Sequence, residues 1–167
     1  MNYHNITKCD MLNGEGIRVV LWVSGCSLHC KNCQNPQTWD FNSGIPFDEA
    51  AKQELFQALN KPYIKGITFS GGHPLEKENI STIIDLCKEI KEKLPDKDIW
   101  IYSGYTWEEI MKDPTLKQIL LFVDVLVDGQ YIDSQKDTTL HWRGSSNQRV
   151  IDVKKSLSSN QTVLLCD

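Results

Sequence analysis

Short apolar runs alternate along this chain with segments of helical periodicity. We expect buried strands at residues 17–23, 66–69, 99–102 and 122–127. Between them, the helical spacing of apolar residues predicts helices at 48–60 and 79–94. Strands that alternate with helices are typical of an α/β fold with a mostly parallel sheet. About four βα units are present, fewer than the eight of a closed barrel, so we predict a partial, open (β/α) barrel.

The expected helices carry their own end signals. Asp48 is a suitable N-cap for the first helix, and Pro95 stops the second. A third, short helix is predicted by the capping-box pattern that begins at Thr106. On the second helix Cys87 falls on the apolar face, so we expect it to be a small buried hydrophobic residue. Towards the C-terminus the periodicity weakens, and the tail at about 150–167 predicts only short strands around a small helix.

Length and charge narrow the class of protein. The 167 residues suit a single domain, which we place at 1–167. A formal net charge of -4 gives no basic footprint, so we expect no nucleic-acid partner. No apolar run reaches the length of a membrane span, and the first residues lack the pattern of a secretory signal. We therefore expect a cytoplasmic protein that does not bind a membrane.

Three of the six cysteines lie close together, directly after the first expected strand. They are Cys26, Cys30 and Cys33, which have the spacing C-x-x-x-C-x-x-C. A reducing compartment disfavours structural disulfides. Closely spaced thiols in such a compartment indicate metal or redox chemistry.

The residues alone leave three interpretations of this cysteine cluster open. The spacing i, i+4, i+7 places all three on one face of a helix, but Gly25 and Pro36 bracket the segment and most of its other residues are polar. Structural zinc would need a fourth ligand, which His29 or Cys9 would have to supply. An iron–sulfur cluster suits soft thiolates, and three ligands would leave one iron of a four-iron cluster open. The polar, flexible character of the loop favours the iron–sulfur interpretation.

The cysteine motif after the first strand resembles that of radical S-adenosylmethionine enzymes. The resemblance implies a [4Fe-4S] cluster held by Cys26, Cys30 and Cys33, with S-adenosylmethionine bound to the open iron. It further implies an oxidoreductase in which one electron cleaves the sulfonium, giving methionine and a 5′-deoxyadenosyl radical. That chemistry belongs to the cofactors, while the protein supplies ligands and orientation.

A closer resemblance is to the family that activates anaerobic ribonucleoside-triphosphate reductase. The stretches that carry it run in order along the chain, at residues 1–4, 13–16, 23–26, 38–39, 42–44, 97–100, 125–129 and 142–148. This resemblance implies a protein substrate. Hydrogen would be abstracted from the α-carbon of a glycine near the C-terminus of the reductase, which leaves a glycyl radical there. An electron donor such as flavodoxin is implied by analogy.

The resemblance also implies contacts with S-adenosylmethionine on two segments. Asn32 and Gln34 flank Cys33, and these three residues would line the adenine side. Asn32 and Gln34 would do so through backbone groups, and the alternative is that their side chains are ordinary polar loop residues. Gly71 and Gly72 resemble the family's Gly-Gly turn, whose backbone approaches the methionine amino group. A plain turn between a strand and a helix is the alternative for these two glycines.

His73 departs from the commoner family pattern, which has an acidic residue at this position. A neutral imidazole accepts only one hydrogen bond, so we expect His73 to serve the cofactor through its backbone. Ser103 and Asp128, each followed by glycine, end later strands and would serve the ribose or carboxylate region, or else form turns. Arg143 would hold a carboxylate of the cofactor or of the partner, or else lie in a solvated loop.

Other functions remain open at the level of the sequence. Within the superfamily, the chain would activate another glycyl-radical enzyme or act on a deazapurine precursor, to which the Gly-Glu-Gly at 14–16 is also suited. Outside it, a zinc module that binds a partner protein without catalysis would use the same cysteines. A short open barrel does not shield a radical from solvent, so we expect the reductase itself to close the site.

Overall fold

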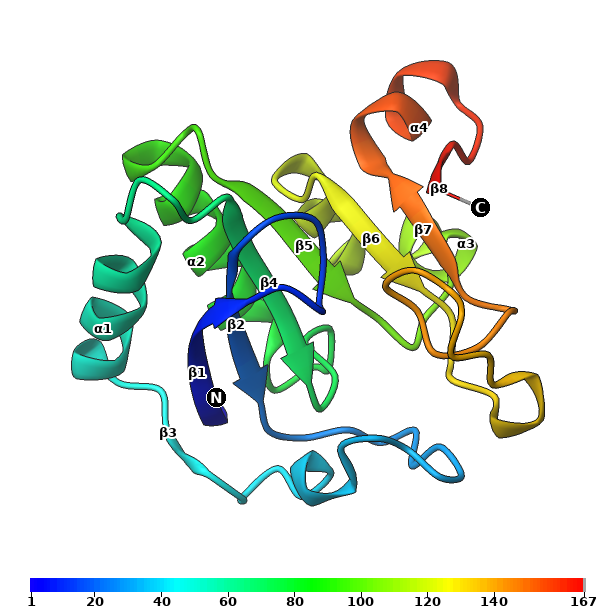
Figure 1. Cartoon of the computed structure of the whole chain (residues 1–167), viewed down its shortest axis with the longest axis horizontal. Helices are drawn as coiled ribbons and strands as arrows, with labels where there is room; N and C mark the ends of the chain where they lie inside the picture. Colours follow the sequence, from blue (N-terminus) through cyan, green and yellow to red (C-terminus); the bar gives the residue numbers. More distant parts are fainter. Residues whose placement is uncertain (167) are drawn as a thin grey trace.

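One eight-stranded sheet organises the molecule (Figure 1). The computed structural model describes residues 1–166, and the strand order is β3-β1-β2-β4-β5-β6-β7-β8. The strands are β1 (Asn2–Asp10), β2 (Arg18–Val23), β3 (Ile45–Pro46), β4 (Gly66–Gly71), β5 (Asp98–Tyr102), β6 (Val125–Asp128), β7 (Arg149–Asp152) and β8 (Leu164–Cys166). Strands β2, β4, β5 and β6 pair in parallel, and antiparallel pairs flank them on both sides.

The predicted α/β character is confirmed, but the prediction of a mostly parallel sheet is wrong. Three strand pairs are parallel and four are antiparallel. The sheet runs from β3 at one edge to β8 at the other and does not close. Strand β1 was not expected, because most of its residues are polar and only Tyr3 and Ile6 are buried. The barrel of the radical S-adenosylmethionine type stays a prediction.

The four expected strands are confirmed with shifted ends, as β2, β4, β5 and β6. Strand β6 begins three residues later than predicted, because the 3-10 helix Leu116–Leu121 and the turn after it occupy the approach. The C-terminal tail forms β7, a helix and β8, as its weak pattern predicted. Both of these strands run antiparallel to their neighbours, which extends the sheet beyond its parallel centre.

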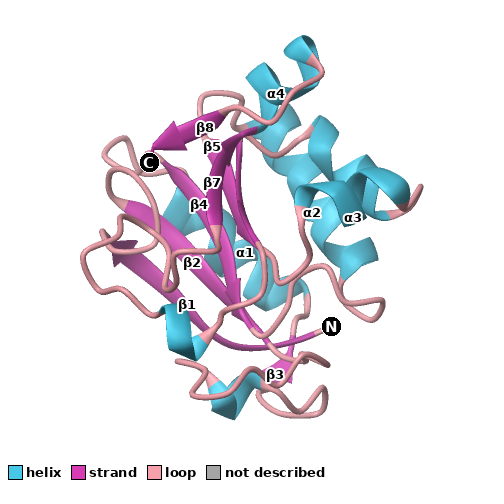
Figure 2. Ribbon diagram, turned by 90° about the vertical axis from the view of Figure 1, so that its right-hand side faces the viewer, coloured by secondary structure: helices cyan, strands magenta, loops and turns pink. Residues whose placement is uncertain are grey.

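Helices cover one face of the sheet. They are α1 (Glu49–Leu59), α2 (Ile80–Lys93), α3 (Trp107–Lys112) and α4 (Val153–Ser159), with further 3-10 helices at Pro36–Thr38 and Asp133–Gln135. Figure 2 shows α2 and α3 on one side of the sheet and loops on the other. Among the described residues, none of the helices has the length and apolar character that a membrane crossing needs.

The predicted helix ends are confirmed. Asp48 Oδ1 accepts a hydrogen bond from Ala51 N at 2.9 Å at the start of α1. Thr106 and Glu109 form the predicted capping box of α3, in which each side chain bonds the other residue's backbone N–H. Cys87 is fully buried on the inward face of α2, as expected. These local signals therefore specify where the helices start and which face they bury.

The two faces of the central strands differ in character, because successive side chains point to opposite sides. The face toward the helices is apolar and contributes Val19, Leu21, Val23, Ile67, Phe69, Ile99, Ile101 and Leu126 to the main core. The opposite, inner face carries larger and more polar side chains, namely Arg18, Trp22, Thr68, Ser70, Trp100 and Tyr102. Since loops rather than helices cover this inner face, it is the face on which a site is able to open.

A buried arginine organises the amino-terminal half of the inner face. The guanidinium of Arg18 is fully buried. It donates three hydrogen bonds, to Glu15 O (3.0 Å), Ile67 O (2.7 Å) and Thr68 Oγ1 (2.9 Å). Asp98 Oδ1 lies 2.6 Å from Nη2 as an ion pair, and the Trp100 ring centre lies 5.1 Å from the guanidinium carbon. The charge is thus compensated, and the loop between β1 and β2 is tied to β4 and β5.

We expect Arg18→Met to lower the free energy of unfolding by about 3 kcal/mol, because hydrogen bonds to a buried charge are lost and Asp98 loses its partner. Lys65→Met is the matched control. Lys65 directly precedes β4, and its Nζ lies 2.7 Å from Oε2 of Glu15 on the same loop in an exposed pair, whose loss costs below about 1 kcal/mol. Urea unfolding of the metal-free, reduced protein measures both. Equal losses in the two variants would contradict the anchoring role of Arg18.

Candidate functional site

A cleft of about 540 Å³ opens at the carboxyl ends of the parallel strands. In Figure 1 this is the lower side, toward which the arrows of β2 and β4 point. Its walls bring together residues far apart in the sequence, among them Cys26, Cys30, Cys33, Gln34, Gly71, Gly72, His73, Ser103, Gly104, Gly129, Tyr131, Trp142 and Arg143. The position is the one at which open parallel sheets bind ligands. The volume is within the range of sites for small ligands and cofactors.

The three clustered cysteines lie on the irregular loop that follows β2. Cys26, Cys30 and Cys33 all line the cleft, and residues 24–35 form no helix. The interpretation as one face of a buried helix is therefore wrong. The loop turns through residues with positive φ, which are Gly25 (93°), His29 (43°) and Asn32 (55°). Glycine, histidine and asparagine are types that adopt this region more readily than most.

The arrangement of the thiols bears on the kind of metal centre. Burial raises the pKa of the Cys26 thiol, so a metal centre would have to stabilise its thiolate. Within residues 1–166, no three or more His, Cys, Asp or Glu side chains gather closely enough to hold one metal ion. Structural zinc would draw four ligands around a single point. In a four-iron cluster the thiolates bind different irons and need not converge in that way.

The two side chains that would complete a zinc site lie elsewhere. The exposed His29 ring stacks on Trp39, with ring centres 4.6 Å apart and planes inclined by 17°. Cys9 is exposed on β1. Neither His29 nor Cys9 belongs to the residues that line the cleft. The cysteine loop therefore presents three thiols to the cleft, and neither of the two side chains expected to complete a zinc site joins them there.

The Gly-Gly turn at the end of β4 lies against the backbone of the cysteine loop. A Cβ at Gly71, whose φ is 102°, would lie 2.8 Å from Val23 N and O. A Cβ at Gly72 would lie 2.5 Å from Gly25 O. Hydrogen bonds from Gly72 N to Val23 O (2.8 Å) and from His73 N to Gly25 O (2.7 Å) fasten the two segments. Both glycines are thus needed for a close backbone approach, whichever ligand binds nearby.

His73 is buried at the wall of the cleft, between two loops. Its Nε2 accepts a hydrogen bond from Gly104 N at 3.2 Å and lies 3.1 Å from Ser103 Oγ. Its Nδ1 lies 3.3 Å from Glu76 Oε1. Because Nε2 accepts from a backbone N–H, the geometry assigns the imidazole proton to Nδ1. Both ring nitrogens thus have partners within the protein. That His73 contacts a cofactor through its backbone stays a prediction.

Glu76 is a buried acid that the sequence did not single out. Its Oε1 accepts hydrogen bonds from Ser27 N and Ser27 Oγ, both at 2.7 Å. The hydrogen bond with His73, together with those from Ser27, lowers the pKa of Glu76 to about 2, so the carboxylate is ionised at neutral pH. The available signal was its position three residues after His73, which places the two side chains within reach in a tight turn.

The two polar residues that flank Cys33 have different surroundings. Gln34 lines the cleft. Asn32 does not line it, because its Nδ2 donates to Asp133 Oδ2 at 2.9 Å across the loop surface. That the backbone of Asn32 contacts a cofactor therefore stays a prediction.

The strand-end motifs of β5 and β6 also differ. Ser103 is buried and lines the cleft. Asp128 lies outside the cleft, where it accepts from Trp107 N at 2.6 Å and pairs with Arg149. The geometry favours the turn interpretation for Asp128, which joins β6, β7 and the start of α3.

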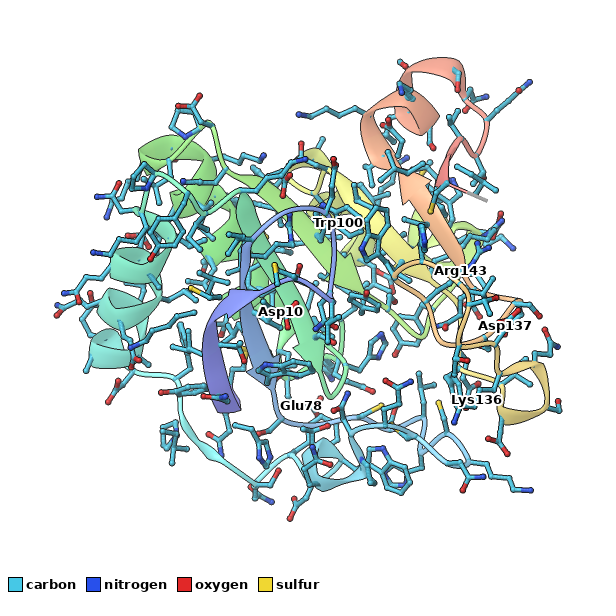
Figure 3. All side chains as sticks on the ribbon, viewed as in Figure 1. Asp10, Glu78, Trp100, Lys136, Asp137 and Arg143 are labelled. Atoms are coloured by element: carbon cyan, nitrogen blue, oxygen red, sulfur yellow. The ribbon has the colours of Figure 1, made fainter. Side chains whose placement is uncertain are left out.

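Two of the residues that line the cleft carry a buried hydrogen-bond donor with no partner among residues 1–166. Arg143 comes from the segment between β6 and β7 (Figure 3) and lines the cleft. Its Nη1 donates to Gln148 O at 3.3 Å, while its Nε is buried and has no acceptor in the described part of the chain. The same holds for Nε1 of Trp39, which also lines the cleft. Buried donors are normally satisfied, so these two atoms mark places where an acceptor remains to be supplied.

The chain resembles a group of bacterial and phage proteins along most of its length. The family model of the 4Fe-4S single cluster domain matches residues 12–151. The anaerobic ribonucleoside-triphosphate reductase-activating protein of Pasteurella multocida is 42% identical over 89% of this chain and 95% of its own length. Proteins of the same name from Escherichia coli K12 and Enterobacteria phage T4 are each 43% identical over 90% of this chain, and over 97% and 93% of their own lengths.

These similarities extend over the parallel strands, the cysteine loop and the cleft. They show that the chain belongs to the family of anaerobic ribonucleoside-triphosphate reductase-activating proteins and that it carries a 4Fe-4S single cluster domain.

Proposed function

We propose that the chain activates an anaerobic ribonucleoside-triphosphate reductase through radical chemistry at a [4Fe-4S] cluster. Cys26, Cys30 and Cys33 would each ligate one iron of the cluster. The cleft beside them would hold S-adenosylmethionine. The observation that carries the proposal is that three thiols of one short loop line the same cleft as the strand ends of β4 and β5.

Bound together, the cluster and S-adenosylmethionine would supply one-electron cleavage of the sulfonium, and the resulting radical chemistry would be directed at a glycine of the reductase. The residues of the chain bind and orient the reactants. Arg143, whose Nε has no acceptor among residues 1–166, would bind a carboxylate through its guanidinium, and Trp39 would donate from Nε1 to a further acceptor. The end of β4 would offer backbone groups of Gly71 and Gly72. These donors support a ligand that has both a carboxylate and heterocyclic acceptors.

The mouth of the cleft has an exposed apolar border. Met11 and Leu12, on the loop between β1 and β2, are 72% and 82% exposed, and Leu12 also lines the cleft. A radical formed here has to be kept from water. The reductase would cover this border when it docks, and would thereby complete the site. A donor such as flavodoxin would deliver the electron.

We expect Cys30→Ala to abolish activation of the reductase, because one iron loses its thiolate. The reconstituted protein is incubated without oxygen with dithionite, S-adenosylmethionine and the cognate reductase, and electron paramagnetic resonance is recorded. The wild type gives a glycine-centred doublet on the reductase and Cys30→Ala gives none. Cys9→Ala is the matched control, since Cys9 is exposed and away from the cleft, and it keeps the doublet.

The possible outcomes separate the alternative functions. A cluster signal and 5′-deoxyadenosine without the doublet would keep the radical chemistry and move the substrate elsewhere. A wild-type protein that takes up zinc but no iron would contradict the cluster. Loss of metal from Cys9→Ala would identify Cys9 as a metal ligand and would thereby support the zinc interpretation.

We expect Arg143→Ala to raise the Kd for S-adenosylmethionine about tenfold, the effect of one lost charge-assisted hydrogen bond. Lys136→Ala is the control, because it removes an exposed positive charge from the same segment (Figure 3). Calorimetric titration of the cluster-loaded protein without oxygen measures both, and iron content is checked in parallel. An unchanged Kd in Arg143→Ala with full iron content would exclude Arg143 from the binding site.

A further inference from the structure

The turn between β4 and α2 holds the backbone on both sides of the first clustered cysteine. Asn79 Nδ2 donates to Ser24 O at 2.8 Å. Glu76 Oε1 accepts from Ser27 N at 2.7 Å. Ser24 and Ser27 bracket Cys26 in the sequence, so one short turn fixes the chain before and after that thiol.

The two side chains through which this turn makes its contacts are buried. Glu76 is 6% exposed and Asn79 is 1% exposed. Glu76 Oε1 receives two donors from Ser27 and one from His73. Hydrogen bonds to an ionised acceptor are about twice as strong as neutral ones, and low surrounding polarity strengthens them further. Ser27 itself is exposed, and both its backbone N and its hydroxyl are bonded to this carboxylate.

The same carboxylate also reaches the end of β5. His73 lies between Glu76 on one side and Ser103 Oγ and Gly104 N on the other, at 3.3, 3.1 and 3.2 Å. Glu76 therefore connects the cysteine loop, the Gly-Gly turn and the loop after β5. These are three of the segments that form the wall of the cleft.

We infer that Glu76 is a positioning residue for the cluster, which fixes Cys26 relative to the Gly-Gly turn and the end of β5. The inference rests on the proposed function, since it takes Cys26 as a cluster ligand. Glu76 is absent from the residues that line the cleft. It acts through Ser27 and His73, and Asn79 supports the other side of Cys26.

Three variants separate positioning from general stability. Glu76→Ala removes all three hydrogen bonds, whereas Glu76→Gln keeps an acceptor oxygen at the same place. Glu78→Ala is the matched control, because Glu78 is an exposed acid of the same turn (Figure 3). The readouts are the rate at which a chelator removes iron without oxygen, and the electron paramagnetic resonance spectrum of the reduced cluster. Circular dichroism of the metal-free variants checks folding.

We expect Glu76→Ala to lose iron about tenfold faster than the wild type and to show a changed cluster spectrum. Glu78→Ala stays within about twofold of the wild type, with an unchanged spectrum, and Glu76→Gln loses iron at a rate between those of the wild type and Glu76→Ala. A wild-type rate and spectrum in Glu76→Ala would overturn the inference. An equal acceleration in Glu78→Ala would overturn it too, because the effect would then be one of the surface charge.

A fourth variant, Ser27→Ala, tests the inference if Glu76→Ala does not fold. Ser27→Ala changes an exposed residue and removes one of the three hydrogen bonds, so we expect iron loss about threefold faster and the same change in the spectrum. An unaffected Ser27→Ala would then overturn the inference. None of these readouts needs the reductase. A stable wild-type cluster that gives no glycyl doublet would therefore refute the proposed substrate and leave the role of Glu76 standing.

Discussion

Direct contact of backbone with backbone at the ends of β2 and β4 is the constraint on which the site depends. Gly71 and Gly72 leave no space for a Cβ against the chain at Val23 and Gly25. That contact sets where the cysteine loop leaves the sheet. Backbone bonds from Gly25 N to Thr38 O and from Cys26 N to Trp39 O brace the same segment from its other side. An irregular loop therefore starts from a fixed point, although it has no secondary structure of its own.

The sequence specified the centre of this fold better than its margins. The runs at 17–23 and 66–69 were predicted because parallel central strands are buried on both faces and are mostly apolar. Strand β1 lies toward an edge and mixes polar with apolar residues, so it gave no such signal. The direction of β7 and β8 was not predicted, because runs of four and three residues are too short to show whether one face or both faces of a strand are buried.

Much of the candidate site followed from one rule, that the carboxyl ends of parallel strands meet at one edge. The rule brought the cysteine loop, the Gly-Gly turn and Ser103 together, as the cleft shows. The rule did not predict Glu76, because its contact with Ser27 joins residues 49 positions apart in the sequence. It also gave no account of Arg18, a charge inside an apolar strand that is compensated by partners from three different segments.

The packing around Arg18 has a consequence for how the cleft is used. Arg18, Thr68 and Trp100 are buried and fill the inner face toward the amino-terminal edge of the sheet. A molecule therefore reaches the cysteines from the carboxyl-terminal rim, the same side on which a large protein partner would sit. The small molecule and the protein partner would use the same opening of the cleft. The small molecule would therefore have to bind before the partner, and its products would leave only after the partner had dissociated. Dissociation of the two proteins would then limit the rate of turnover, however fast the reaction in the cleft is.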